Sequence, residues 1–224
     1  MKYTALLSIL VLFAAVALVA AHVAIWMHAP VEATMGLVQK IFYLHLPLAW
    51  WALFSFFLVF VGSVGVLVRK TEIWDAMAGS AAELGVLFSG LALITGSLWA
   101  RPIWGVWWAW DPRLTTTLIM WFVYMGYLVL RTSPIPQAKR RTLCAVLGIV
   151  AFVDIPLVFY STRLWRSIHP SVISSSGGGM EPEMWQAMGI SLAAVGALWL
   201  VLVILRTRQV MAQDRLDSLW AARL

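Results

Sequence analysis

Six continuous apolar runs dominate this 224-residue chain, and each is long enough to cross a lipid bilayer. A hydrocarbon core about 30 Å thick needs about 20 apolar residues in a helix. The runs lack the period-two alternation that strands of a membrane barrel show. We therefore expect six transmembrane helices, at roughly residues 4–26, 46–68, 78–100, 114–130, 142–161 and 185–205.

The composition indicates that lipid is the natural solvent of this chain. Apolar residues make up 62% of it and charged residues 12%, with a mean hydropathy of +0.87. Soluble domains carry about 45–50% apolar and about 25% charged residues. A disordered chain is excluded because it needs low hydrophobicity and high charge. The expected fold is an all-α integral membrane protein, in which residues 1–224 form a single six-helix domain.

Basic residues in the gaps between the runs predict the orientation. The gaps on one side hold eleven Lys and Arg residues, and those on the other side hold five. Because the richer side is normally cytoplasmic, we expect both termini, and a tail at about 207–224, in the cytoplasm of a bacterium with the chain in its inner membrane. The first run imitates a signal peptide but continues to Trp26, beyond a usual apolar region of roughly 7–15 residues, which favours a retained span. A flexible Ser/Gly hinge is expected at 174–179, in the third outward loop.

The second outward loop, at about 101–115, concentrates aromatic residues. Trp104, Trp107, Trp108 and Trp110 fall within this one loop, together with two prolines and a glycine. A belt of interfacial tryptophans is the ordinary alternative, but a belt places single rings at the ends of each span. A large exposed apolar surface more often marks a binding site. The loop therefore favours a large, planar ligand.

Two histidines bracket this loop on the same expected side of the membrane. His45 lies where the first outward loop enters the second span, and His169 lies in the third outward loop. A lone histidine is usually a hydrogen-bonded structural group, whereas two imidazoles can serve as the axial ligands of haem iron. His22 and His28 are weaker candidates because neither has an aromatic platform in its local sequence.

The string from Trp104 to Thr115 resembles the tryptophan-rich WWD signature of haem-handling proteins in cytochrome c maturation. More closely, the whole chain is similar to the haem exporter protein C (CcmC) family. It shares a His-Leu-Pro entry to the second span, the WWD loop between the third and fourth spans, and a histidine before the sixth. The related proteins that perform the final ligation are much longer.

This resemblance implies delivery of haem at the periplasmic face to a membrane-anchored haem chaperone of the CcmE type. The chain would work beside an ABC transporter pair of the CcmA and CcmB types and a small single-span protein of the CcmD type. His45 and His169 would be the axial ligands of a transiently bound haem b. The haem and chaperone platform would consist of Trp104, Trp107, Trp108, Trp110 and Asp111.

The haem propionates would need a cationic partner, and a guanidinium fits a carboxylate well. Arg113 is the first choice because it lies inside the signature, although an anchor to lipid phosphate is an alternative. Asp111 is either structural, bonded to an indole N–H or to Arg113, or in direct contact with the ligand or partner. Arg101, Arg163 and Arg166 also lie on the outward side.

Two carboxylates fall inside spans, Glu83 and Asp154. We expect each to make an interhelical polar contact, since a proton relay would need more ionisable neighbours. The resulting hypothesis is a haem-delivery factor rather than an enzyme. A b-type cytochrome-like electron carrier and a haem permease subunit are the alternatives. The chain lacks a P-loop, so any ATP-driven step would need a partner.

Overall fold

The computed structural model describes residues 2–170 and 180–221, so the expected hinge at 174–179 lies outside the described residues. The described chain is built from helices and short helical turns. In order, these are α1 (Lys2–Val23), a π-helical turn η1 (Ala24–His28), a 3₁₀ turn η2 (Leu37–Ile41), α2 (Phe42–Arg69), α3 (Glu72–Trp104), α4 (Pro112–Arg131), α5 (Gln137–Ala151), α6 (Asp154–Leu164) and α7 (Pro182–Ala221).

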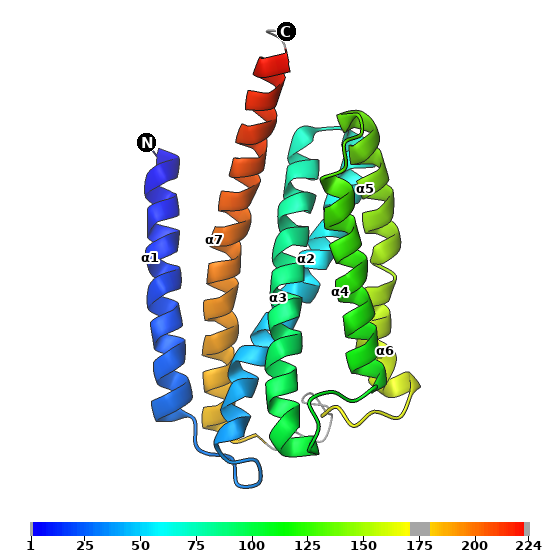
Figure 1. The fold of residues 1–224 in the computed structure, drawn as a ribbon. Coiled ribbons are helices and arrows are strands. Elements are labelled where there is room, and N and C mark those ends of the chain that lie inside the picture. Colours follow the sequence, from blue (N-terminus) through cyan, green and yellow to red (C-terminus); the bar gives the residue numbers. More distant parts are fainter. Residues whose placement is uncertain (1, 171–179, 222–224) are drawn as a thin grey trace.

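Six helical segments are long and apolar enough to cross a membrane, which confirms the expected number. They stand side by side, with both termini at one end of the bundle (Figure 1). The α1–α2 connection, the α3–α4 loop and the chain that follows α6 lie at the opposite end (Figure 1). We call this opposite end the site end.

The fifth span differs from the continuous run expected at 142–161. It consists of two helices, α5 and α6, separated at Phe152 and Val153. Pro156 is the physical reason, because proline has no N–H and its ring would collide with the carbonyl four residues earlier, that of Phe152. The amide of Ile155 instead donates to the Phe152 carbonyl at 3.1 Å.

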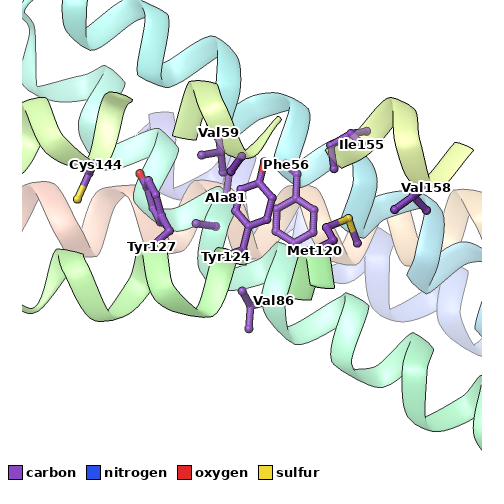
Figure 2. Packing of buried hydrophobic residues seen from close by; sticks show 12 residues of the cluster. Phe56, Val59, Ala81, Val86, Met120, Tyr124, Tyr127, Cys144, Ile155 and Val158 are labelled. Atoms are coloured by element: carbon purple, nitrogen blue, oxygen red, sulfur yellow. The ribbon is translucent and has the colours of Figure 1, made fainter. Parts of the chain in front are cut away.

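The main core lies between α2, α3, α4, α5 and α6, and α6 contributes Ile155 and Val158 to it (Figure 2). Phe56 and Tyr124 stack at its centre, with ring centroids 3.7 Å apart. Ala81, Gly85 and Ser89 form a buried stripe of small residues on α3. A side chain at Gly85 would collide with Phe56. The small residues therefore allow the close approach of α2 and α3 that their spacing predicts.

The tryptophan-rich loop is shorter than the expected range of 101–115, because α3 continues to Trp104 and α4 begins at Pro112. Gly105 ends α3 in a left-handed conformation with φ 76°, which glycine adopts without strain. Asp111 caps α4, where its side chain accepts a hydrogen bond from the Arg113 amide, and Pro112 takes the first helical position. The loop itself is limited to residues 105–111.

Candidate functional site

A cavity of about 640 Å³ lies at the site end between α2, α3, α4 and α6. Its volume falls within the range of about 300–1,000 Å³ that small-molecule sites occupy. Residues from three separate loops or helix ends meet in it. Five of the eight predicted site residues line the cavity: His45, Trp104, Trp108, Arg113 and His169.

His45 lies in the first turn of α2 and points at α3. Its Nδ1 is 3.0 Å from the carbonyl oxygen of Ala92 and 3.1 Å from the hydroxyl of Thr95. A carbonyl oxygen only accepts hydrogen bonds, so Nδ1 carries the proton and the Nε2 lone pair remains available. A Cβ at Gly96 would lie 3.0 Å from the ring carbon Cε1, so glycine provides the space for the ring.

His169 shows the same pattern in the segment that follows α6. Its Nδ1 is 3.0 Å from the Pro170 carbonyl oxygen, which again leaves Nε2 with its lone pair. Burial, and after it the positive charge of Arg113, lower the pKa of His169 to about 4. His169 is therefore neutral at neutral pH, the form in which imidazole binds a metal.

Asp111 joins the tryptophan-rich loop to the segment that carries His169. Its carboxylate accepts hydrogen bonds from the Ser167 hydroxyl at 3.0 Å and the Ile168 amide at 2.8 Å, besides the Arg113 amide at 2.9 Å. Burial alone would raise the pKa of Asp111, but these three bonds outweigh it and the net shift is downward. Among the two roles expected for Asp111, the geometry favours the structural one. Its partners are these amides and a hydroxyl rather than an indole.

The four loop tryptophans divide into two pairs, which the sequence alone did not indicate. Trp104 and Trp108 line the cavity. Trp107 and Trp110 lie outside its lining, with 57% and 78% of their surfaces exposed. The Nε1 of Trp108 is buried and has no hydrogen-bond partner among the described residues. A buried donor of this kind fits a ligand that brings an acceptor.

Of Arg101, Arg113, Arg163 and Arg166 at the site end, only Arg113 combines a cavity position with a charge that acts on both histidines. It lines the cavity, and its charge acts on His169. The Arg101 guanidinium donates a hydrogen bond to the carbonyl oxygen of Gly105, at 2.6 Å. Arg163 lines the cavity beside the Tyr160 ring, 5.8 Å from its centroid. Arg166 is exposed and outside the cavity lining.

The weaker histidine candidates lie elsewhere. His28 places its Nε2 2.7 Å from the Gln186 side-chain oxygen of α7, and His22 lies beside Trp26. Neither lines the cavity. No group of three or more His, Cys, Asp or Glu side chains that could hold a bare metal ion occurs in the part of the chain that is described. Two imidazoles are enough for haem, because the porphyrin supplies the other four iron ligands.

Sequence reasoning missed four residues at this site: Trp50, Thr95, Gly96 and Trp99. Trp50 and Trp99 were hidden among the apolar residues of spans two and three. A polar residue followed by glycine near the outer end of span three was the available signal for Thr95 and Gly96. Their role depends on His45 from another helix, and one helix's sequence does not reveal that partner.

The two carboxylates inside spans have different outcomes. Glu83 makes the expected interhelical contact, because its carboxylate accepts hydrogen bonds from both Nε and Nη2 of Arg206 in α7. Asp154 does not make the expected interhelical contact through its Oδ2 atom. This atom is buried and has no hydrogen-bond partner among the described residues. Cys144 is buried in α5, as a small apolar residue would be.

The pKa of His169 gives a first testable prediction. In the haem-free protein, NMR of labelled histidine should show His169 titrating near 4 rather than at its ordinary value of 6.5. Arg113→Gln removes a positive charge that disfavours the imidazolium, so the pKa should rise, while burial keeps it below 6.5. A midpoint near 6.5 in the unmodified protein would contradict the desolvation of this half-buried ring.

Comparison with known proteins connects this geometry to a family. The family model described as Heme exporter protein C (CcmC) matches residues 2–222. Heme exporter protein C of Rhodobacter capsulatus is 34% identical over 193 residues, which cover 85% of this chain and 80% of that protein. The corresponding protein of Bradyrhizobium diazoefficiens is 32% identical over 193 residues, 85% of this chain and 73% of that protein. The protein of Escherichia coli K12 is 27% identical over 196 residues, 88% of this chain and 80% of that protein.

Six membrane-crossing helices and bacterial relatives of this kind describe a multi-pass protein of the bacterial inner membrane. The match extends over nearly the whole chain, including every residue that lines the cavity. The chain belongs to the heme exporter protein C family.

Proposed function

We propose that this protein binds haem in the cavity at the site end and delivers it to a periplasmic haem chaperone of the CcmE type during biogenesis of c-type cytochromes. His45 and His169 bind the iron from the two faces of the porphyrin. The observation that carries this proposal is that both imidazoles meet at one cavity with Nδ1 bound to a carbonyl and Nε2 free to ligate. The protein acts as a transfer factor and not as an enzyme.

The shape of the cavity supports a defined haem orientation. Its lining on α2 runs from Phe42 to Leu53, about 16 Å of helix. Met120 and Phe152 line its apolar part, and Arg113 and Trp108 line it as well. The porphyrin edge without carboxylates packs on the apolar side chains. The propionates accept hydrogen bonds from the Arg113 guanidinium and the Trp108 indole N–H.

The bound haem is haem b, held through ligands and packing alone. A thioether bond to this chain would need a thiol beside the site. The single cysteine, Cys144, is buried in α5 against the main core and does not line the cavity. Non-covalent binding by two imidazoles allows the haem to be passed on.

The exposed tryptophan pair, Trp107 and Trp110, is the contact surface for the chaperone. Both rings project from the loop beside the cavity, where they leave an apolar surface uncovered. Tryptophan is enriched in binding hot spots. ABC transporter subunits of the CcmA and CcmB types and a single-span protein of the CcmD type complete the assembly that the family resemblance implies.

Haem transfer to the chaperone tests this proposal directly. The purified haem-loaded protein should transfer haem to the soluble domain of a CcmE-type chaperone. Trp107→Ala/Trp110→Ala should keep the haem spectrum and lose transfer, because these rings lie outside the cavity. Trp104→Ala/Trp108→Ala is the matched control and should lose haem retention itself. Normal transfer by the Trp107/Trp110 variant would identify that pair as an interfacial belt only.

The site end faces the periplasm in this proposal, with both termini in the cytoplasm. Eleven basic residues on the terminal side against five on the other support this orientation. In a Cys144→Ala background, cysteine at Trp107 should react in intact cells with a thiol reagent that cannot cross the membrane. Cysteine at Arg215, in the C-terminal part of α7, should react only after lysis. The opposite labelling pattern would reverse the orientation.

A b-type electron carrier and a haem permease remain the competing functions. An electron carrier would keep its haem through purification and reduce it reversibly with quinol. A permease would move haem across proteoliposomes that contain no other protein. Transfer to the chaperone without either behaviour supports the delivery function.

A further inference from the structure

Residues of α2 and of α6 both line the site cavity. The first half of the broken span, α5, packs against both α2 and α4, whereas α6 packs chiefly against α4. Figure 1 shows α2 leaning away from α6 toward the site end. The break at Phe152 and Val153 therefore lets the two helices diverge, and the cavity occupies the space between them.

Several residues that line the cavity also have large exposed fractions. Trp50 of α2 is 43% exposed, and Phe159 and Tyr160 of α6 are 44% and 51% exposed. All three lie within helices that are long and apolar enough to cross the membrane, so any part of these side chains that is exposed outside the cavity would face lipid. Where one residue both lines the cavity and contacts lipid, a single layer of side chains separates the cavity from the lipid.

An aromatic contact spans this layer of side chains. The rings of Trp50 and Phe159 meet edge to face, with centroids 6.3 Å apart. An aromatic contact of this type is weak compared with a packed helix interface, and only side-chain rotation is needed to open it. Pro156 and Tyr160 also line a second, largely apolar groove that α4, α5 and α6 share.

We propose that the gap between α2 and α6 is a lateral portal, closed by Trp50 and Phe159, through which haem passes between the lipid leaflet at the site end and the cavity. This inference rests on the proposed haem site. Haem is amphipathic, with an apolar ring and two carboxylates at one edge. In the leaflet its ring lies at the depth of Trp50 and its carboxylates lie near the headgroups. The haem can enter the portal edge first, without exposing its apolar ring to water.

Arg163 supports this direction of entry. It lines the cavity close to the end of α6, with its guanidinium 5.8 Å from the Tyr160 ring centroid. It can meet the carboxylates as they leave the headgroup region. Arg113, on the other side of the cavity, then receives them. The portal thus has apolar side chains at the depth of the haem ring and a basic side chain, Arg163, at the depth of the haem carboxylates.

Tethering the two aromatic positions tests the portal. Trp50→Cys/Phe159→Cys is prepared with Cys144→Ala and joined with a short bis-methanethiosulfonate linker that dithiothreitol cleaves. The protein is placed in lipid nanodiscs, and haem is added through vesicles that contain it. The tethered protein should acquire haem at least roughly tenfold more slowly than the untethered protein, and cleavage of the linker before haem addition should restore the rate.

A matched tether controls for rigidity. Phe54 of α2 and Trp199 of α7 meet edge to face with centroids 5.2 Å apart, and neither residue lines the cavity. Phe54→Cys/Trp199→Cys, tethered in the same way, leaves α6 free and should load at the untethered rate. Phe159→Ala opens the portal and should accelerate loading without changing the final spectrum.

The outcomes separate the portal from the haem site. If the untethered cysteine variant binds no haem with an imidazole spectrum, the proposed site is wrong and the portal is wrong with it. If it binds haem normally and the Trp50/Phe159 tether leaves the rate unchanged, the site stands and the portal is overturned. Equal slowing by both tethers would also overturn it, because rigidity would then explain the effect.

Discussion

Replacing His45 or His169 by alanine is expected to cause the largest loss of haem retention of any single substitution in this protein. Both histidines line the same cavity with Nδ1 bonded to a carbonyl and Nε2 left to bind iron, so in the proposed site each change removes one bond to iron. Loss of a supporting partner behind a metal ligand costs about 10–100-fold in affinity. Loss of the ligand itself should cost more. The measurement is haem dissociation from the purified protein, followed by transfer to an excess of apomyoglobin.

Chemical rescue distinguishes a missing ligand from a damaged fold. Added imidazole fits the space left by either side chain and should restore part of the haem retention in both alanine variants. His28→Ala is the matched control, because His28 contacts Gln186 away from the cavity and should retain haem normally. Normal retention in both the His45 and His169 variants would remove the axial pair from the account.

Asp111→Ala is expected to have the second largest effect, although Asp111 does not line the cavity. Its carboxylate holds Ser167 and Ile168, the two residues that immediately precede His169. Without it, the Ser167 hydroxyl and the Ile168 amide lose their partner, and the segment that carries His169 loses its anchor. Haem retention should fall about 10–100-fold, in the range of other losses behind a metal ligand.

Asp111→Asn gives a sharper version of this test. Asparagine keeps one oxygen, which can still accept from Ser167 and from the Arg113 amide at the cap of α4. Its NH₂ group would face the Ile168 amide, where two donors cannot bond. Retention should therefore fall with the amount of inserted protein unchanged, and imidazole should rescue it. Equal retention in Asp111→Asn and the unmodified protein would show that the segment is held by other contacts.

The fold was largely accessible from the sequence because membrane spans depend on length and apolarity alone. Each predicted span lies within or overlaps an observed one, and the errors occur at ends and at the break. The break at Phe152 was missed because the run stays apolar across it, even though Pro156 was visible. Helix ends at Gly105 and Asp111 depend on local backbone geometry, for which glycine and the Asp-Pro pair were readable signals.

The sequence predicted which residue types form the site, but it did not predict which role each residue has. The two histidines and Arg113 reach one cavity as their positions at the span ends suggest. The division of the tryptophans depends on which way each ring turns from a short loop, and neighbouring residues in sequence did not determine that. Thr95 and Trp50 act through contacts with residues from other helices, so only the packed bundle identifies them.

The spin state of the iron in the haem-loaded protein is the most direct test of the axial pair. Electron paramagnetic resonance of the oxidised, unmodified protein should give a low-spin signal of iron with two imidazole ligands. His45→Ala and His169→Ala should each lose that signal and recover it with imidazole. A high-spin signal in the unmodified protein, or a low-spin signal unchanged in either variant, would contradict ligation by His45 and His169.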